Sequence, residues 1–502
     1  MSSRAFVGGR WWRDGAAFSF LVENRRIVAH GVDPSFADEI VNLDGAFVMP
    51  GFIDCHMHVL PAGLQALQLD LSGASSREEV LRRVRERAAD LAPTDWVLAV
   101  QYDANRFEDG IDVGADELDA ASGGRKTILR HSSGHACVAS RSALLEARVR
   151  ADTEDPRGGT IVRNRSGEPT GLLLENAMEF VYRKAPDLPP DQWPDAIDAV
   201  SATLLSKGIT CASDMMTGQR GLAAELAAYR NAQSKLRIRL FVQWNRMFGK
   251  HAEPDAQLPD DDRLRFLGVK LFADGAIGSG TAAIYGSYTS GGDGTLIYPP
   301  EELKRRVLAA DEAGYRITIH SIGDRSTDLV LDAYEACADP SKHRLEHAML
   351  LSDEQIQRIR RSSIRVTMQP EFLLAFGPAY MRRLGPERAA NLKRIRSLLD
   401  AGIIVGLSSD NPIVPGDPWT GIRAAAMRPD GFNQAEAISL REAAILYTQG
   451  AAAANFEETE MGSLDPGQLA DFQLYDSDPI EGDGRLIATF VGGEQAWPKS
   501  EE

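Results

Sequence analysis

The stretch Phe47-Val48-Met49-Pro50-Gly51-Phe52-Ile53-Asp54-Cys55-His56-Met57-His58 places two histidines at the end of an apolar, strand-like run. In an extended strand, alternate side chains lie on the same face, so His56 and His58 can point at one spot near the end of the strand. Two imidazoles that converge in this way indicate a metal site. An isolated H-x-H pair also occurs at ordinary protein surfaces, so the interpretation depends on the rest of the chain.

Other candidate ligands follow the same pattern, each ending an apolar run further along the chain: Lys270, His320, His347 and Asp410. Between these runs lie segments long enough for helices, such as 300–314 and 352–361. Strands that alternate with helices predict a parallel sheet, and a parallel sheet that closes into a barrel gathers its functional side chains at the carboxyl ends of the strands. The pattern therefore predicts one site at the mouth of a barrel.

Eight strands can be counted for this barrel: the one that ends at His58, and then 208–214, 236–243, 268–272, 317–320, 344–347, 365–369 and 403–410. We predict an α/β fold, a distorted TIM (β/α)8 barrel made of residues 51–69 and 208–459. Residues 70–207 would be an inserted lid subdomain over the barrel mouth, because connections of this length are usually functional. Short β-like runs at both ends of the chain predict a composite β-sandwich from residues 1–50 and 460–502.

Composition excludes several classes of partner. The chain has 502 residues, of which 43% are hydrophobic and 25% charged, as in an ordinary globular protein. Its net charge of -17 argues against binding to nucleic acid or to an anionic membrane surface. We find no apolar segment of the length that an export signal or a membrane span needs, and four widely spaced cysteines are typical of reduced thiols. These features predict a cytoplasmic protein.

Two of the candidates are charged, and burying a charge in an apolar strand costs free energy. A lysine is almost never fully buried without a partner, so Lys270 in the run Val269-Lys-Leu-Phe272 demands one. A carbamate formed on its amine by carbon dioxide would replace the cation by a carboxylate that can bridge two metal ions. Asp410 likewise needs a cation or a donor nearby. A histidine such as His320, taken alone, is more often a core residue, so the whole set is far more specific than any member.

At this point the motifs resemble those of the amidohydrolase superfamily, and within it the amidohydrolase family 3 branch that includes N-substituted formamide deformylase. The resemblance extends over nearly the whole chain, and the motifs that carry it are Met49-Pro-Gly-Phe-Ile-Asp-Cys-His-Met-His58, Lys270-Leu-Phe-Ala-Asp-Gly275 with Gly278-Ser-Gly-Thr-Ala282, His320-Ser-Ile-Gly-Asp324, Arg344-Leu-Glu-His347 and Gly462-Ser-Leu-Asp-Pro-Gly-Gln-Leu-Ala-Asp471. Two motifs in the insertion also match, Arg130-His-Ser-Ser-Gly-His135 and Gly167-Glu-Pro-Thr-Gly-Leu-Leu-Leu-Glu175.

The resemblance implies a set of metal ligands. His56, His58 and Asp410 would hold the more buried ion, His320 and His347 the second, and Lys270 would bridge them as N6-carboxylysine. Imidazole and carboxylate ligands suit zinc, with manganese, cobalt or iron as substitutes. The residues expected near the substrate are His131 and His135 in the insertion, for which a structural role is equally open, and Asp274, Arg325 and Gln369 at the strand ends.

The expected reaction is hydrolysis of a C–N bond other than a peptide bond, in an amide, formamide, carbamate or cyclic amide, by attack of metal-bound hydroxide. Asp410 would pass the water proton to the leaving nitrogen. Two alternatives remain open: a metal-dependent decarboxylase or lyase on the same scaffold, and a binding relative without catalysis, against which the complete ligand set argues. By resemblance we also expect a homo-oligomer, most simply a dimer.

Overall fold

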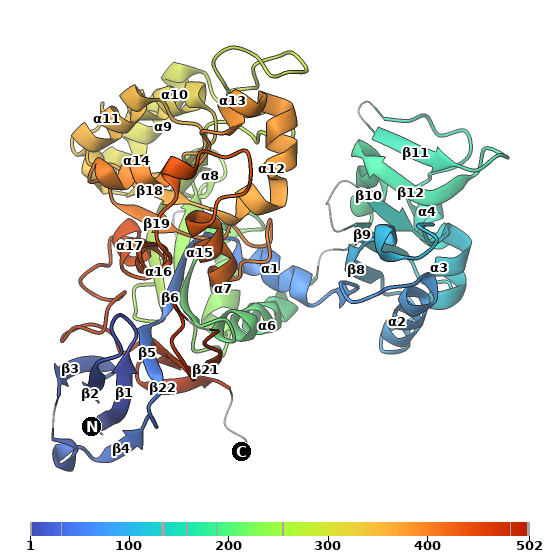
Figure 1. Ribbon diagram of the computed structural model, residues 1–502. Helices are drawn as coiled ribbons and strands as arrows, with labels where there is room; N and C mark the ends of the chain where they lie inside the picture. The colour runs from blue at the N-terminus through green and yellow to red at the C-terminus, as the bar shows by residue number, and fades with distance from the viewer. Residues whose placement is uncertain are drawn as a thin grey trace. The chain divides into compact units, whose positions relative to one another are not determined.

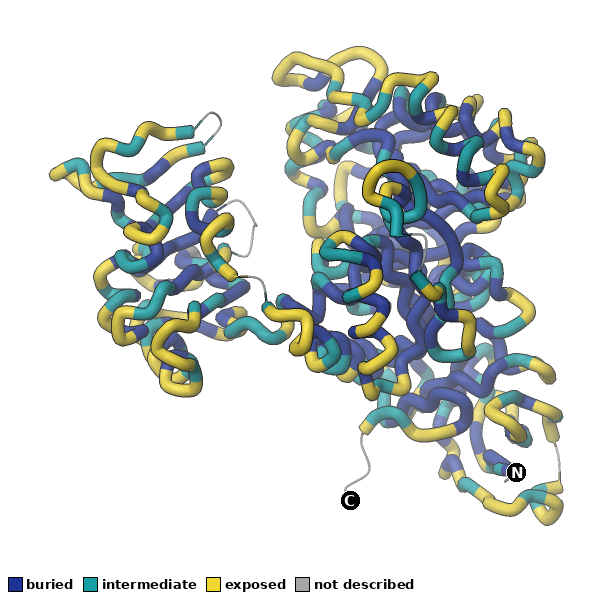
Figure 2. The backbone as a smooth tube through the Cα atoms, turned by 180° about the vertical axis from the view of Figure 1, so that it is seen from behind, coloured by how far each residue is buried: buried dark blue, intermediate teal, exposed yellow. Residues whose placement is uncertain are grey.

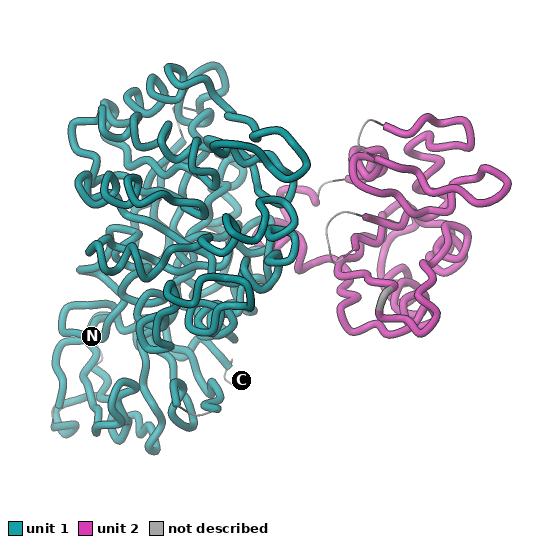
Figure 3. The backbone as a smooth tube through the Cα atoms, turned by 45° about the horizontal axis from the view of Figure 1, so that its top comes forward, with its two compact units in different colours: residues 1–62, 197–502 teal, residues 63–196 magenta. Residues whose placement is uncertain are grey.

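The computed structural model describes residues 3–31, 33–131, 136–156, 159–186, 188–253, 256–481 and 483–498 (Figure 1). The chain forms two compact units (Figure 3). One contains residues 1–62 and 197–502, and the other contains residues 63–196. Every helix among the described residues is too short or too polar to cross a membrane.

The larger unit contains an eight-stranded parallel sheet that curls into a barrel. Its strands, in spatial order, are β6 (Phe52–Met57), β13 (Ile209–Thr217), β14 (Arg237–Gln243), β15 (Leu264–Phe272), β16 (Ile317–Ser321), β17 (Arg344–His347), β18 (Arg365–Met368) and β19 (Val405–Leu407). Backbone hydrogen bonds bring its two end strands together: Asp410 N donates to His56 O at 2.7 Å and His58 N to Asn411 O at 2.8 Å. The predicted TIM barrel is confirmed.

Helices surround this barrel, so its strands are buried on both faces and read as apolar runs. The helices of this unit are α7 (Leu222–Asn231), α8 (Trp244–Met247), α9 (Pro300–Glu312), α10 (Asp324–Tyr334), α11 (Asp353–Arg361), α12 (Glu371–Leu384), α13 (Pro386–Ala389), α14 (Ile395–Asp400), α15 (Pro418–Ala426), α16 (Leu440–Leu446) and α17 (Gln449–Ala454). Two more, α1 (Val59–Ala66) and α6 (Trp193–Leu205), lie where the chain passes from one unit to the other.

Small side chains let α17 approach the barrel closely. A Cβ added at Gly406 on β19 would lie 2.8 Å from Ala454 Cβ and 2.9 Å from Cys55 Sγ. Cys55 therefore lies between the barrel wall and this helix, where its thiol donates to Leu407 O at 3.4 Å. It faces away from His56, as strand alternation predicts.

A second sheet joins the two ends of the chain. Its strands run in the order β22 (Glu494–Trp497), β21 (Leu486–Val491), β20 (Phe472–Tyr475), β5 (Phe47–Pro50), β1 (Arg4–Trp11), β2 (Ala17–Glu23) and β3 (Arg26–His30), and β4 (Glu39–Asn42) also pairs with β1. An aromatic cluster from both ends packs on it: the ring of Phe6 lies 5.0 Å from that of Phe472, which stacks on Phe490 at 4.5 Å. Figure 2 shows the buried backbone that runs through this region and the barrel.

The smaller unit has its own six-stranded sheet, with the order β11 (Gly159–Arg163), β12 (Pro169–Glu175), β10 (Ala136–Ala139), β9 (Thr127–His131), β8 (Val97–Tyr102) and β7 (Leu69–Asp70). Its helices are α2 (Arg77–Ala89), α3 (Ala115–Ser122), α4 (Arg141–Glu146) and α5 (Glu179–Tyr182). Val80 and Val84 of α2 pack with Val97 and Leu129 of the sheet in a core of their own. The inserted segment thus has the sheet, helices and core of a separate folding unit.

A buried ion pair ties the barrel to the terminal sheet. Arg237, at the start of β14, binds Asp471 through two hydrogen bonds of 2.6 and 2.9 Å, and neither side chain is more than 6% exposed. Gly492 N donates to the same carboxylate at 2.7 Å. The carboxylate thereby joins the start of β14 to the residues just before β20 and just after β21.

Asp471→Ala should lower the free energy of unfolding by about 3–5 kcal/mol, because it leaves the Arg237 guanidinium buried without a counter-ion. Urea unfolding followed by tryptophan fluorescence measures the change. Glu494→Ala is the matched control, because Glu494 and its partner Lys235 are 58% and 47% exposed and such surface pairs contribute about 1 kcal/mol or less. Equal midpoints for the two variants would contradict the assigned role of Asp471.

Candidate metal centre

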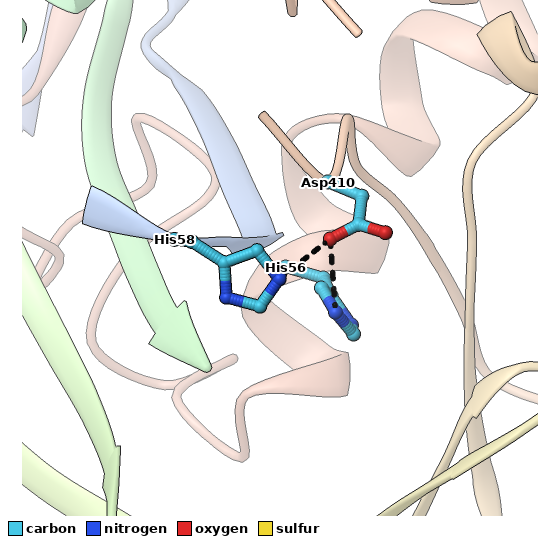
Figure 4. A group of neighbouring side chains, drawn as sticks. All are labelled: His56, His58 and Asp410. Atoms are coloured by element: carbon cyan, nitrogen blue, oxygen red, sulfur yellow. Dashed lines mark ion pairs between the residues drawn. The ribbon is translucent and has the colours of Figure 1, made fainter. Parts of the chain in front are cut away.

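Three ligand candidates meet at the carboxyl ends of β6 and β19 (Figure 4). Asp410 Oδ1 lies 2.9 Å from His58 Nε2 and 3.5 Å from His56 Nε2. All three side chains are buried, and Asp410 has the left-handed backbone value φ 65°. A non-glycine residue adopts this conformation only where the surrounding structure enforces it, which is common at functional sites. The closure of the barrel supplies that enforcement here.

The histidines of β16 and β17, His320 and His347, lie beside this group. The ring of His347 is 4.6 Å from that of His56 and 4.5 Å from that of His320, centre to centre. His347 also has a left-handed backbone, with φ 70°. Lys270, on β15, is only 1% exposed, and its Nζ lies over the ring of Phe272 at 5.0 Å. The fold therefore gathers all the predicted ligand residues of the barrel at one end of it.

Buried polar atoms without hydrogen-bond partners mark this place. Among the described residues, Lys270 Nζ, His58 Nδ1 and Asp410 Oδ1 have none, although the oxygen is close to two imidazole nitrogens. Leaving such atoms unpaired is costly, and a cation beside Asp410 together with a carbamate on the lysine would remove the cost at Asp410 Oδ1 and Lys270 Nζ. Burial, with a smaller contribution from Lys270, lowers the pKa of His56 to about 4, so its ring is neutral and keeps a lone pair for a metal ion. The donor set thus fits a divalent cation.

Glu346 orients His56 from the adjacent part of the barrel. Its carboxylate accepts hydrogen bonds from His56 Nδ1 and from the hydroxyls of Thr318 and Thr367, and it forms an ion pair with Arg344. Burial opposes its ionisation, but Arg344 and His56 hold the pKa of Glu346 well below its usual value. A carboxylate on Nδ1 directs Nε2 of His56 toward the ion. The structure thus shows Glu346 in direct contact with His56.

Asp274 stabilises the loop beside His320 by accepting backbone hydrogen bonds. Its carboxylate accepts backbone hydrogen bonds from Ile322 at 3.0 Å and from Gly323 and Ala283 at 2.9 Å each. It also lies 3.6 Å from His320 Nε2, which is 3.0 Å from Gly275 O. These contacts hold the ring of His320 with Nε2 toward oxygen acceptors, so Nδ1 is the nitrogen that remains for an ion.

The other residues predicted to contact substrate lie in different surroundings. Gln369, at the end of β18, is buried against His347 with Oε1 2.8 Å from Nδ1. Arg325 donates to Asp293 O at 3.0 Å. His131 ends β9 in the smaller unit, with Nε2 3.3 Å from Asp103 Oδ1, and His135 lies outside the described residues. Contact of these residues with a substrate stays a prediction.

Two supporting residues have no signal in the sequence pattern. Lys393, which follows α13 in a loop, donates to Gln369 Oε1 at 2.9 Å and to His347 O at 3.2 Å. Asp54 accepts from Ser409 N at 3.1 Å and from the Ser409 hydroxyl, which braces the chain next to Asp410. Burial raises the pKa of Asp54 to about 6. Neither residue ends an apolar run in the way that the predicted ligands do.

A second group with metal-ligating side chains lies elsewhere on the barrel unit: Asp311, Cys337 and His343. Ile317 N donates to His343 Nδ1 at 3.3 Å, so Nδ1 carries the lone pair of the neutral ring. Nε2, 3.4 Å from Asp311 Oδ1, then carries the proton. A protonated nitrogen cannot ligate a metal ion, and we assign this group a structural role.

Glu346→Gln should weaken zinc binding by about 10–100-fold, the usual effect of losing a residue that orients a ligating histidine. The dissociation constant can be measured by competition with a chromophoric chelator. Glu457→Gln is the matched control, because Glu457 is also a buried carboxylate paired with an arginine of a barrel strand, Arg239 at 2.6 Å. Unchanged zinc affinity in Glu346→Gln would show that His56 needs no such partner.

Comparisons with known proteins identify the family of this chain. Residues 39–496 match the model of the family described as "Amidohydrolase family". The chain is 34% identical to Protein LONG AFTER FAR-RED 3 of Arabidopsis thaliana, over 96% of this chain and 88% of that protein. It is 28% identical to N-substituted formamide deformylase of Arthrobacter pascens, over 96% and 95% of the two chains. An uncharacterized metal-dependent hydrolase from Pyrococcus furiosus superposes with a TM-score of 0.79 at 27% identity, over 95% of this chain and 100% of that one. The chain therefore belongs to the amidohydrolase family of metal-dependent hydrolases.

Proposed function

We propose that this hydrolase cleaves a non-peptide C–N bond of a small molecule, in an amide, formamide, carbamate or cyclic amide, with two zinc ions. The observation that carries the proposal is the unpartnered, buried Nζ of Lys270 among four histidines and Asp410. An aliphatic ammonium in that position would repel a metal ion. A carboxylate there would instead complete the ligand set.

The chemistry of Lys270 supports this conversion. Burial lowers the pKa of its amine to about 8, so a sizeable fraction is neutral near neutral pH. The neutral amine can attack carbon dioxide, forming an N–C bond and releasing one proton to solvent, which leaves a carbamate. Its two oxygens could serve one ion held by His56, His58 and Asp410 and another held by His320 and His347. Bound divalent cations supply Lewis-acid chemistry, lowering the pKa of water to about 7 and polarising a substrate carbonyl.

Asp410 is placed to move the proton. His56 and His58 lower its pKa against the effect of burial, so it is a carboxylate and can accept a proton from the attacking water. It would then deliver this proton to the departing nitrogen, because an amide anion is a very poor leaving group. The remaining chain excludes bulk water: His56, Lys270, His347 and Asp410 are each at most 6% exposed.

Two measurements on the full-length protein test this function. Elemental analysis after expression with zinc and bicarbonate should find close to two ions per chain. N-substituted formamides are the first substrates to try, because one relative is named for that activity. In water enriched in oxygen-18, hydrolysis places the label in the acid product, whereas decarboxylation leaves the product unlabelled. Absence of label, or of metal in the folded protein, would refute the proposal.

Asp410→Asn should reduce turnover by at least about 100-fold, the lower range for losing a general acid–base group. The protein should stay folded, because asparagine has nearly the same shape as aspartate. Circular dichroism and metal analysis accompany the rate measurement. Near wild-type turnover in this variant would exclude Asp410 as the proton carrier.

Lys270→Ala should bind less metal, because the carbamate that would bridge the two ions is missing. It should lose activity for the same reason. A small carboxylic acid such as propionate should restore part of both, because it can occupy the space of the missing carbamate. Lys235→Ala, which removes an exposed lysine, controls for the loss of charge alone. If Lys270→Ala kept its full metal content, the bridge would have to be abandoned.

A further inference from the structure

Lys393 is a fully buried lysine outside the proposed ligand set, with 0% exposure. Its backbone is fixed on both sides, since its N–H donates to Met349 O at 2.9 Å and its carbonyl accepts from Arg428 Nη1 at 2.9 Å. Its Nζ donates to His347 O at 3.2 Å and to Gln369 Oε1 at 2.9 Å. The side chain therefore contacts the backbone carbonyl of His347, one of the proposed ligands, and also the side chain of Gln369.

The donors and acceptors in this group determine one another. An ammonium can only donate, so the atom of Gln369 that faces Lys393 must be the amide oxygen. The same oxygen lies 2.8 Å from His347 Nδ1, which must then carry a hydrogen. In a neutral imidazole this leaves the lone pair on Nε2. His347 can then bind a metal ion through Nε2, as the proposed site requires.

Ser408, on the other side of the amide, cannot make this selection. Gln369 Nε2 donates to Ser408 Oγ at 3.0 Å, and a serine hydroxyl can either donate or accept. If the amide turned over, Ser408 could rotate its hydroxyl to donate to the oxygen, and the amide nitrogen would face His347. The ring would then hold its proton on Nε2. Lys393 opposes this arrangement most strongly, because two donors would meet, whereas Ser408 would give up only its long hydrogen bond of 3.3 Å to Met368 O.

We propose that Lys393 is a positioning residue that acts through Gln369 to select the Nδ1-protonated tautomer of His347, so that Nε2 is available to a metal ion. The inference rests on the proposed function only in treating His347 as a ligand. It also implies that His56 and His347 reach the same tautomer by different chemistry. His56 faces the carboxylate of Glu346, an obligate acceptor, whereas His347 faces an amide whose orientation a cation must set.

The direct test is the tautomer of His347, read by nitrogen-15 NMR of the ring in metal-free, full-length protein and assigned with His347→Asn. Spectra are recorded at pH 6, well below the usual pKa of a lysine amine, so that Lys393 is an ammonium. Wild type should show the Nδ1–H form in about ten-fold excess or more, and Lys393→Met should show a mixture. The ring of His56 is the internal control and should not change.

Zinc titration gives an independent measurement. Lys393→Met should raise the weaker of two dissociation constants by about 10–100-fold and leave the tighter one within about two-fold. Gln369→Ala should have the same effect, and adding Lys393→Met to it should change little further, because both act along one path. Gln369→Ala also keeps the test open if Lys393→Met fails to fold.

The outcomes separate this inference from the proposed function. An unchanged His347 tautomer in Lys393→Met, or full additivity with Gln369→Ala, would overturn the role of Lys393 even if wild type hydrolyses formamides. A shifted tautomer would support that role even if no amide substrate were found. Failure to find an amide substrate would then count only against the proposed reaction.

Discussion

The hydrogen bond from Asp410 N to His56 O, where the last strand of the barrel meets the first, is the contact on which the site depends. It joins residues that are more than 350 positions apart in the sequence. Because His58 N bonds to Asn411 O across the same seam, the backbone fixes both histidines and the aspartate before any ion arrives. A metal centre built on such a seam needs little rearrangement on binding, which favours a tight and well-defined site.

The treatment of buried charge distinguishes this centre from the rest of the barrel. Three arginines in the strands are fully buried, and each has a carboxylate partner: Arg237 with Asp471, Arg239 with Glu457 and Arg344 with Glu346. Lys270 lies among the same strands without a carboxylate in contact, among the described residues. The fold therefore pairs these three buried arginines with carboxylates, whereas the buried lysine next to the ligand histidines has none in contact in the described part of the chain.

The sequence was sufficient to predict the barrel and to choose the candidate ligands that it gathers, because both leave local signals. Buried parallel strands read as apolar runs, and a polar residue at the end of such a run stands out, as with His320 and Asp410. The supporting contacts leave no such signal. The contact of Glu346 with His56, on a strand that is not its neighbour in the sheet, depends on how the barrel closes. Lys393 reaches His347 from a loop whose path is set by tertiary packing. The orientation of Gln369 depends in turn on that lysine, so it could not be inferred earlier.

The terminal sheet has a consequence for how the chain is made. β5 leads directly into the first barrel strand, yet its neighbour in the sheet is β20, with Pro50 paired to Phe472. During synthesis the amino-terminal strands leave the ribosome long before this partner exists, although domains commonly begin to fold from the amino end. Until the last segment emerges, β5 presents an open edge that could pair with other chains. The nascent chain can therefore aggregate through this edge for a prolonged period. The exposure ends when the final strands are made and β20 pairs with β5.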